Sequence, residues 1–154
     1  MNIFILDTNP KIAAQYHVDK HVVKMILETA QLLCSAHWFN GSEAPYKLTH
    51  KNHPCSVWTR ECIENYNWLS MLGLELCKEY TYRYGKIHKT QEHIIWLYKN
   101  KPSLKTMGAC TLPPTAMPQE CRTDNVVSSY RKYYIIEKRS FAKWTKRSQP
   151  EWFY

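Results

Sequence analysis

The chain has 154 residues, 44% of them apolar, and its 21 Lys and Arg outnumber its 13 Asp and Glu, which gives a formal net charge of +8. This length and apolar content predict a single domain, residues 1–154, around one packed core, and they exclude a disordered tail protein. Only four glycines stand against eleven tyrosines and six tryptophans, which disfavours a β architecture rich in tight turns. We therefore expect a mainly α, single-domain helical bundle.

The distribution of apolar residues and cysteines disfavours two further classes of protein. No apolar run approaches the roughly 18 residues that span a bilayer, so we expect no membrane association. The N-terminus lacks a basic segment followed by an apolar one, which predicts a cytoplasmic protein. The six cysteines include no Cys-x-x-Cys pair and are typical of reduced core thiols, not of zinc ligands or disulfides.

The chain begins with a predicted arm followed by a long helix. Residues 3–6 form a short apolar run that we expect to be extended, and residues 7–10, Asp-Thr-Asn-Pro, are typical of a helix start. Apolar positions at three- and four-residue spacing predict a helix from Ile12 to about Trp38, with a bend near Val18.

Two more helices are predicted in the middle of the chain. Residues 40–52 are polar and irregular, and Pro54 begins a second long helix that continues to Tyr84, where Gly85 ends it. A shorter helix is predicted over residues 90–99.

The last third combines a loop, a helix and a tail. Four prolines between residues 102 and 118 predict a long proline-rich loop, because no regular element tolerates them well. Asp124 is the expected cap of a last helix, from Asn125 to about Trp144, and residues 150–154 form an aromatic tail.

One stripe of the first predicted helix combines groups suited to catalysis. Its members recur every three or four residues and so share one helix face. They are His17, His21, Lys24, Glu28 and Gln31. Two imidazoles one turn apart suit proton transfer or metal binding, whereas a Lys–Glu pair at this spacing is also common on a solvated face. Both interpretations stay open at this point.

The segment from Tyr46 to Pro54 is rich in groups that bind anions. Lysines and histidines precede a helix start, whose free N–H groups attract phosphate. The predicted phosphate contacts here are Lys47, His50, Lys51 and His53. Alternatively, Asn52 or His53 only caps the helix.

A metal site is an alternative use of the histidines. His17 and His21 form one closely spaced pair, and His50 and His53 form another, so four imidazoles could surround a metal ion. Neither pair has the glutamate of the zinc-protease motif. We therefore expect no metal and no other cofactor, and these four histidines are the only candidate ligands.

The C-terminal part carries most of the positive charge. Residues 122–154 contain eight Lys or Arg against three acidic residues. Aromatic side chains alternate with them, a pattern typical of phosphate neutralisation combined with base stacking, although a solvated basic helix has the same composition. The predicted nucleic-acid contacts are Arg131, Lys132, Lys138, Arg139, Lys143, Trp144, Lys146 and Arg147.

The end of the second predicted helix carries tyrosines around an arginine. Residues 80–84 are Tyr-Thr-Tyr-Arg-Tyr. A guanidinium and a phenol that line a pocket hold phosphates and stack on bases. Tyr82 and Arg83 therefore complete the predicted phosphate-binding set.

Three segments resemble a family of short proteins encoded by tailed phages and large DNA viruses. They are residues 17–25 (HVDKHVVKM), 46–54 (YKLTHKNHP) and 150–153 (PEWF). The likeness extends over nearly the whole chain. It implies a viral or phage protein that acts in the cytoplasm of the host cell.

The chain is also similar to the pyrimidine-dimer DNA glycosylases of the phage endonuclease V type. The likeness rests on residues 13–17 (AAQYH) at the start of the first helix, on residues 54–84 as a long second helix, and on the tail 152–154 (WFY). It implies a small basic helical enzyme whose first long helix carries a histidine and a functional glutamate.

Two departures from that family change the implied chemistry. The family's nucleophile is the α-amine of a small residue exposed by methionine removal, whereas Asn2 is too large for routine trimming, so we expect Met1 to stay. Where the family has its glutamate, this chain has Lys24, with Glu28 one turn later. The resemblance then implies that Lys24, activated by burial or a neighbouring cation, is the nucleophile or an electrostatic stabiliser, while Glu28 and the stripe's histidines transfer protons.

These observations together predict a viral protein that acts on DNA or RNA, as a DNA glycosylase or lyase on a damaged or modified base. The expected catalytic residues are Lys24, Glu28, His17 and His21. One alternative is a non-catalytic nucleic-acid-binding protein that targets a host factor. Another is an enzyme that acts on a free nucleotide or a small phosphorylated molecule. The oligomeric state is not indicated by the sequence.

Overall fold

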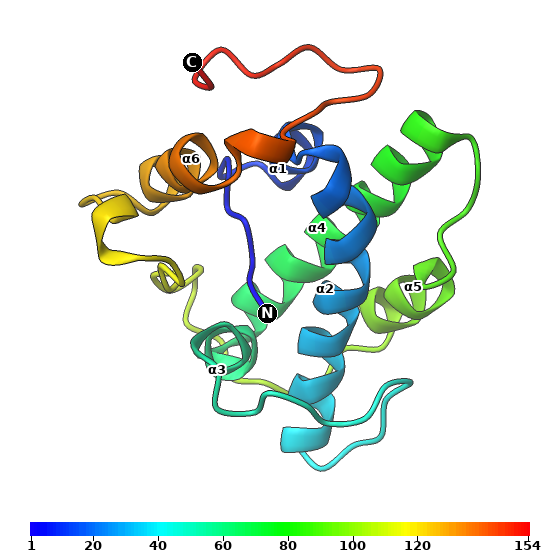
Figure 1. Ribbon diagram of the computed structural model, residues 1–154. Helices are drawn as coiled ribbons and strands as arrows, with labels where there is room; N and C mark the ends of the chain where they lie inside the picture. The colour runs from blue at the N-terminus through cyan, green and yellow to red at the C-terminus, as the bar shows by residue number, and fades with distance from the viewer.

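The computed structural model describes residues 1–154 and is all-helical, without a strand, which confirms the mainly α single-domain bundle (Figure 1). The α-helices are α1 (Pro10–Tyr16), α2 (Asp19–Phe39), α3 (Pro54–Glu61), α4 (Ile63–Tyr84), α5 (Gln91–Lys99) and α6 (Val126–Glu137). Two 3₁₀ turns, η1 (Gln119–Cys121) and η2 (Arg139–Phe141), flank α6. No helix combines the length and the apolar composition needed to cross a membrane.

The first predicted helix is divided in two at the expected bend. Asn9 caps α1 by accepting hydrogen bonds from the Lys11 and Ile12 amides, but α1 ends at Tyr16 and His17 is extended. The chain then restarts as α2, where the Asp19 amide donates to the Lys143 carbonyl at 2.8 Å. The start of α2 is therefore held by the C-terminal segment, a contact that helix periodicity cannot reveal.

The second predicted helix is also divided. Cys62 is extended, with φ −157° and ψ 164°, and separates α3 from α4. The Ile63 amide donates to the Lys105 carbonyl at 2.8 Å, and Asn65 Nδ2 donates to the Trp58 carbonyl at 2.8 Å. These bonds replace the helical ones that the break removes. Gly85 ends α4 in the left-handed conformation, φ 68°, as predicted.

The core lies between α2 and α4, with the N-terminal arm beside them. Residues 3–6 of the arm are buried, and Figure 1 shows the arm running along α2 toward α3. Gly73 allows α4 to approach its neighbours closely, because a Cβ there would lie 3.2 Å from Thr29 and 3.1 Å from Ile94. Five of the six cysteines are buried and Cys110 is exposed.

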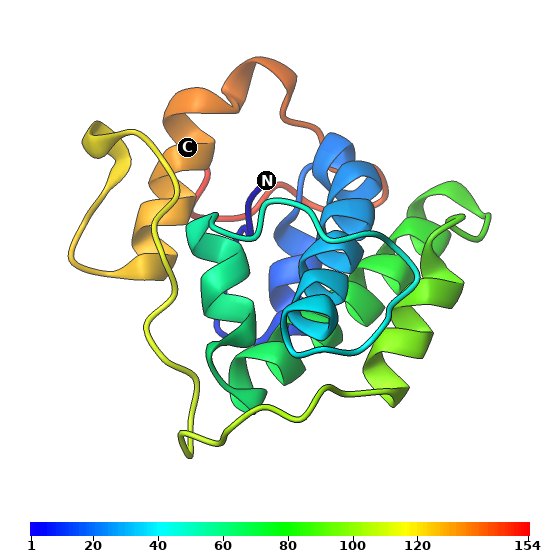
Figure 2. The same ribbon diagram turned by 90° about the horizontal axis from the view of Figure 1, so that it is seen from below.

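The proline-rich loop is confirmed as a long segment without helix up to η1. It passes along the outside of α3 and α4 before reaching α6 (Figure 2). Its Thr111 carbonyl accepts from Trp58 Nε1 at 3.1 Å and its Pro114 carbonyl accepts from the Tyr130 hydroxyl at 2.9 Å. The loop thus satisfies polar groups of α3 and α6.

The last predicted helix is too long. Helix α6 ends at Glu137, and its cap is Asn125, whose side chain accepts from the Ser128 amide at 2.9 Å, not Asp124. The chain after η2 bends outward and turns back past α1 as a tail without further helix (Figure 1), and its Trp144 Nε1 donates to the Tyr16 carbonyl at 2.8 Å. These contacts with α1 replace the remaining predicted helical turns.

Candidate active site

A cavity of about 360 Å³ lies where the N-terminal arm meets α2, the segment before α3 and the end of α6. We call it the amine cavity. Its lining residues are Met1, Asn2, Phe4, His21, Lys24, Met25, Glu28, His53, Ala116, Tyr133 and Lys138. The cavity brings together three predicted catalytic residues, His21, Lys24 and Glu28, and two predicted phosphate contacts, His53 and Lys138.

Glu28 lies between two amines. The Met1 α-amine is 3.2 Å from Glu28 Oε1, and Lys24 Nζ is 3.7 Å from Oε2. The Glu28 residue is buried. The pairing of Lys24 with Glu28 follows from their spacing, but sequence reasoning missed the Met1 amine. The buried apolar run of residues 3–6, directly before the first helix, was the one available sign that the arm begins inside the fold.

The expected activation of Lys24 by burial is wrong. Its side chain is 71% exposed, whereas the Met1 side chain is 3% exposed. Helix α2 presents position 24 to solvent, because the buried face of this turn is formed by its neighbours Val22 and Met25. The burial of its side chain holds Met1 in the fold, whereas Lys24 is free to move in solvent.

Asn2 fixes the arm beside the cavity. Its Nδ2 donates to the Ala116 carbonyl at 2.9 Å, and its Oδ1 accepts from the Ile3 amide at 2.8 Å and from the Tyr130 hydroxyl at 2.9 Å. These bonds join the arm to the proline-rich loop and to α6. The Met1 amine is thereby positioned before any ligand binds.

His21 lines the cavity as a neutral ring. Its Nδ1 lies 2.7 Å from the Tyr134 hydroxyl, and its ring stacks on Phe4 with centroids 4.2 Å apart. Burial, with smaller contributions from positive neighbours, lowers the pKa of His21 to about 2. At neutral pH it therefore holds no imidazolium proton to donate, which argues against the general-acid part of its predicted acid–base role.

His17 does not reach the cavity, so its predicted catalytic role is wrong. The break after Tyr16 removes it from the face of α2 and places it in the core. Its Nδ1 bonds the Ala13 carbonyl at 2.6 Å, and its Nε2 is enclosed without a partner. Burial lowers the pKa of His17 to about 4.

The structure does not gather the four histidines of the alternative metal site into one group. No group of three or more His, Cys, Asp or Glu side chains in the fold could hold a metal ion. The rings of His17 and His21 have centroids 6.5 Å apart, and their Nδ1 atoms bond different groups. His50 is exposed and bonds Thr49 Oγ1 through Nδ1 at 2.8 Å.

In the segment before α3, only His53 lines the amine cavity. Its Nδ1 accepts from the Cys55 amide at 3.0 Å, so it caps α3, as the alternative interpretation predicts. Burial lowers the pKa of His53, and the nearby Met1 amine and His50 act in the same direction. Lys47 and Lys51 are exposed and lie outside the cavity lining.

The predicted phosphate contact Arg83 is wrong, because its side chain is fully enclosed. It donates to Glu79 at 2.8 Å, to Asp19 at 2.9 Å, and to the carbonyls of His17 and Gln15. No donor faces solvent, so this guanidinium joins α4 to the start of α2 and binds no phosphate.

Arg147 also bonds the protein. It donates to both carboxylate oxygens of Glu79 at 2.9 Å, and its guanidinium covers the ring of Tyr82 at 4.3 Å. Burial alone would raise the pKa of Glu79, but the hydrogen bonds from Arg147 and Arg83 outweigh it and lower that pKa. The predicted stacking face of Tyr82 is thus partly covered.

Two more arginines and a tryptophan of the C-terminal segment bond internally. Arg131 donates to the Leu6 carbonyl at 2.9 Å and to Asp7 at 3.3 Å, and Arg139 donates to the Tyr154 carbonyl. Trp144 is half-buried and packs on α1 through its bond to Tyr16. These side chains hold the tail in place. The donors that make these bonds are not free for the predicted nucleic-acid contacts.

The lysines of the same segment differ from its arginines. Lys132, Lys143 and Lys146 are exposed and form no ion pair. Lys138 is half-buried, lines the amine cavity and lies 4.7 Å from the centre of the Tyr133 ring. The unpaired positive charge of the segment therefore comes mainly from lysines, and the unpaired arginines are the exposed Arg122 and Arg139.

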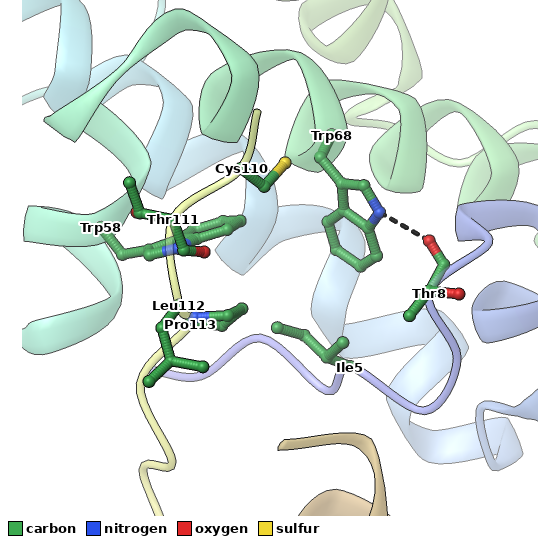
Figure 3. Close-up of a pocket in the computed structure, with 8 residues that line it drawn as sticks. All are labelled: Ile5, Thr8, Trp58, Trp68, Cys110, Thr111, Leu112 and Pro113. Carbon is green, nitrogen blue, oxygen red and sulfur yellow. Dashed lines mark hydrogen bonds between the residues drawn. The ribbon is translucent and has the colours of Figure 1, made fainter. Parts of the chain in front are cut away.

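A second cavity, of about 450 Å³, lies on the other side of the arm between Trp58, Trp68 and Leu112 (Figure 3). Both indole N–H groups already donate to carbonyls, that of Trp68 to Thr8 at 2.9 Å. Its one ionisable group is the Cys110 thiol, whose pKa is raised, chiefly by burial. This cavity suits apolar contact, and the amine cavity is the better candidate for chemistry.

Comparisons with known proteins give no family for this chain. The sequence matches no protein-family model and no curated protein, and no solved structure matches the fold. The resemblances to phage and viral proteins therefore stay predictions, and the functional argument rests on the amine cavity itself.

Proposed function

We propose that the protein is a DNA glycosylase or lyase that forms an imine between an amine of the amine cavity and the sugar of a damaged or modified nucleotide. One observation carries the proposal: the buried Glu28 carboxylate lies 3.2 Å from the Met1 α-amine and 3.7 Å from Lys24 Nζ. A carboxylate in this position accepts the proton that an ammonium group must lose before it can attack.

The proposed reaction begins with attack of the neutral amine on C1′ of the deoxyribose. The N-glycosidic bond breaks, and the base leaves with the bonding electrons and takes the proton that Glu28 had accepted. A proton moves from the amine nitrogen to O4′ as the ring opens, which leaves a protonated imine between that nitrogen and C1′. Glu28 then removes a C2′ proton, which breaks the C3′–O bond and cleaves the strand. At an abasic site the amine condenses with the C1′ aldehyde and releases water.

The α-amine of Met1 is better suited to the attack than Lys24. The Met1 amine is the closer of the two to Glu28, at 3.2 Å against 3.7 Å for Lys24 Nζ. Met1 is also held by the Asn2 bonds, whereas Lys24 is largely exposed. In a chain that carries a free amine on Met1, we assign the attack to that amine and electrostatic stabilisation to Lys24.

Borohydride trapping tests the proposal. The wild-type protein should give a covalent adduct with an oligonucleotide that contains an abasic site. Glu28→Gln should lower the trapping rate by about 100-fold, the usual size of a lost general base. Glu75→Gln is the matched control, because Glu75 also pairs with a lysine, Lys78 at 3.2 Å, but lies on α4 outside the cavity.

The circular dichroism spectra and melting curves of both glutamate variants establish that they fold. Absence of an adduct with abasic and modified-base substrates alike would contradict the proposal. Binding of the same oligonucleotides without an adduct would instead support a non-catalytic nucleic-acid-binding protein.

A small phosphorylated substrate is the second candidate. It is favoured by the internal bonding of Arg83, Arg131, Arg139 and Arg147, which leaves fewer free guanidinium donors for a nucleic-acid backbone. Trapping on 2-deoxyribose 5-phosphate separates the two. Much faster trapping on the oligonucleotide supports a nucleic-acid enzyme, and equal trapping supports a small-molecule enzyme.

A further inference from the structure

Two imidazoles of the amine cavity each have one nitrogen already engaged. His53 Nδ1 accepts from the Cys55 amide at 3.0 Å, and His21 Nδ1 lies 2.7 Å from the Tyr134 hydroxyl. A backbone amide can only donate, so His53 Nδ1 carries no proton. The neutral His53 ring therefore carries its proton on Nε2.

Hydrogen-bond satisfaction assigns the same tautomer to His21. The Tyr134 side chain is fully buried, and its hydroxyl accepts from the Val18 amide at 3.4 Å. Its own proton has one acceptor in the fold, His21 Nδ1. If that nitrogen carried a proton, the phenol proton would be buried without a partner, which is unfavourable. His21 therefore accepts at Nδ1 and carries its proton on Nε2.

Both Nε2–H groups remain available to a ligand. His21 and His53 line the cavity, and neither Nε2 bonds the protein. The polar atoms that are enclosed without a partner are elsewhere: His17 Nε2, Asn67 Oδ1 and Trp152 Nε1. The two free nitrogens therefore reach the surface of the cavity.

The surroundings keep both rings uncharged. The charged or titratable groups near His21 are His17, Lys24 and Lys138, and those near His53 are the Met1 amine, His50 and Glu28. Burial and the positive groups lower the pKa of both histidines and outweigh Glu28. The cavity thus combines neutral donors with an excess of ammonium groups, which suits an anion with several oxygen acceptors.

We propose that His21 and His53 bind a phosphate group of the substrate through neutral Nε2–H donors, while Lys24 and Lys138 supply the positive charge. Tyr134 is a positioning residue, because it sets the tautomer of His21. That this phosphate adjoins the reacting sugar rests on the proposed function. The binding of the phosphate itself requires no imine. The phosphate could belong to a nucleic acid or to a free nucleotide.

The tautomers are measured by ¹⁵N NMR of the imidazoles. In the wild-type protein at pH 7, Nδ1 of His21 and His53 should have pyridine-like shifts and Nε2 pyrrole-like shifts. Tyr134→Phe should move His21 toward a mixture of tautomers and leave His53 unchanged. A proton on Nδ1 of either ring in the wild type would overturn the inference.

Binding is measured with an oligonucleotide that carries a tetrahydrofuran in place of the abasic sugar, because this analogue has no aldehyde and forms no imine. His21→Leu and His53→Leu should each weaken binding by about tenfold or more, the effect of losing a hydrogen bond to a charged group. His21→Gln, which keeps an uncharged donor, should bind within about threefold of the wild type.

His88→Leu is the matched control for His53→Leu. His88 Nδ1 accepts from the Thr90 amide at 3.0 Å, the same local bond, but His88 lies outside the cavity. It should leave the affinity unchanged. An equal loss in His88→Leu, or no loss in either cavity variant, would overturn the inference, and where His21→Leu fails to fold, His53→Leu and the NMR shifts still decide.

The pH dependence separates neutral donors from imidazolium contacts. Wild-type affinity for the tetrahydrofuran oligonucleotide should vary by no more than about twofold between pH 6 and 8, whereas an imidazolium would lose most of its charge over this range. A tenfold fall with rising pH would overturn the inference.

Two further comparisons identify the source of the phosphate and show which of the two proposals fails. The first measures the binding of thymidine 5′-monophosphate. If it binds as tightly as the oligonucleotide and depends equally on His21 and His53, the phosphate belongs to a free nucleotide. If it binds much more weakly, the phosphate belongs to DNA. If trapping fails but binding still depends on His21 and His53, only the imine function is contradicted. Successful trapping without histidine dependence removes the phosphate inference alone.

Discussion

The amine cavity and the C-terminal segment are both rich in positive groups, but they use them differently. In the segment, Arg131, Arg139 and Arg147 donate to carbonyls and carboxylates of the fold. In the cavity, Lys138 and the Nε2 atoms of His21 and His53 have no such protein acceptor. Formal charge along a sequence therefore indicates a binding surface only where the donors are left free.

The chemistry of the side chains explains the difference. A guanidinium presents five donors in a planar fork and satisfies several acceptors at once, so it is well suited to joining distant segments. Arg83 does this with four acceptors. They are the Gln15 carbonyl of α1, the His17 carbonyl just after α1, Asp19 of α2 and Glu79 of α4. A lysine offers a flexible point charge that can stay in water even beside a carboxylate, as the exposed Lys24 does beside Glu28.

The largest expected effect separates structural arginines from binding ones. Arg83→Met should lower the free energy of unfolding by about 3–5 kcal/mol, because it removes a buried charge that pairs with Glu79 and Asp19 and leaves the His17 and Gln15 carbonyls without their donor. Arg139→Met, at an exposed position, should cost less than about 1 kcal/mol. Urea unfolding measures both. If Arg83→Met were fully stable but bound DNA more weakly than the wild type, Arg83 would be a phosphate contact after all, as the sequence predicted.

The next effect is a loss of stability in mild acid. The folded-state pKa values of His17, about 4, and His21, about 2, lie below the ordinary 6.5. Between these limits the unfolded chain binds more protons, so stability is complete above pH 6.5 and falls as the pH falls. Each ring contributes roughly 1.4 kcal/mol per pH unit, or about 3–4 kcal/mol for the pair from pH 7 to pH 5.

Urea unfolding at pH 7, 6 and 5 checks this loss. The carboxyls of Asp19 and Glu79, whose pKa values are lowered, respond only at more acidic pH. The arginines that hold the C-terminal segment do not titrate in this range at all. A stability that does not change between pH 7 and pH 5 would show that the two rings are not buried as neutral groups.

A smaller effect is expected when the arm is loosened. Asn2→Ala removes the bonds that hold the Met1 amine beside Glu28, and a misplacement of about 1 Å costs about 100-fold in rate. Trapping on an abasic oligonucleotide measures it. The control is Asn100→Ala, which removes an exposed bond to the Trp96 carbonyl. If both variants are trapped at the wild-type rate, the position of the arm does not govern the chemistry.

The smallest effect concerns the exposed lysines. Replacing Lys132, Lys143 and Lys146 together by Gln should weaken oligonucleotide binding by about tenfold. It should also reduce the slope of log affinity against log salt by about one for each phosphate that a lysine no longer neutralises. A salt titration of the triple variant measures both quantities. No change in either would place nucleic acid elsewhere or favour the small-molecule substrate.

Local pattern was enough to predict most of the helices. Asn9-Pro10 and Gly85 mark helix ends through their own backbone preferences, and the spacing of Lys24 and Glu28 places both on one face. The bend near Val18 was predicted, but the full break there and the break before α4 were not, because each depends on an amide that donates to a carbonyl far along the chain. These carbonyls belong to Lys143 and Lys105.

The same limit applies to the candidate site. Histidines at positions 17 and 21 share a face only in a continuous helix, so the break separates them into core and cavity. Arg83 resembled a phosphate ligand because its partner Asp19 lies 64 residues earlier. The amine of Met1 entered the site through the bonds of Asn2 to Ala116 and Tyr130, which no local pattern indicates.

The most direct test of the amine cavity is mass-spectrometric mapping of the borohydride-reduced adduct. Intact mass first establishes that the purified chain begins at Met1 with a free amine. We expect the reduced sugar to be attached to the Met1 nitrogen, and we expect Lys24→Gln to leave it there. Attachment to a lysine outside the cavity, or to the Met1 amine at an undiminished rate in Glu28→Gln, would contradict it.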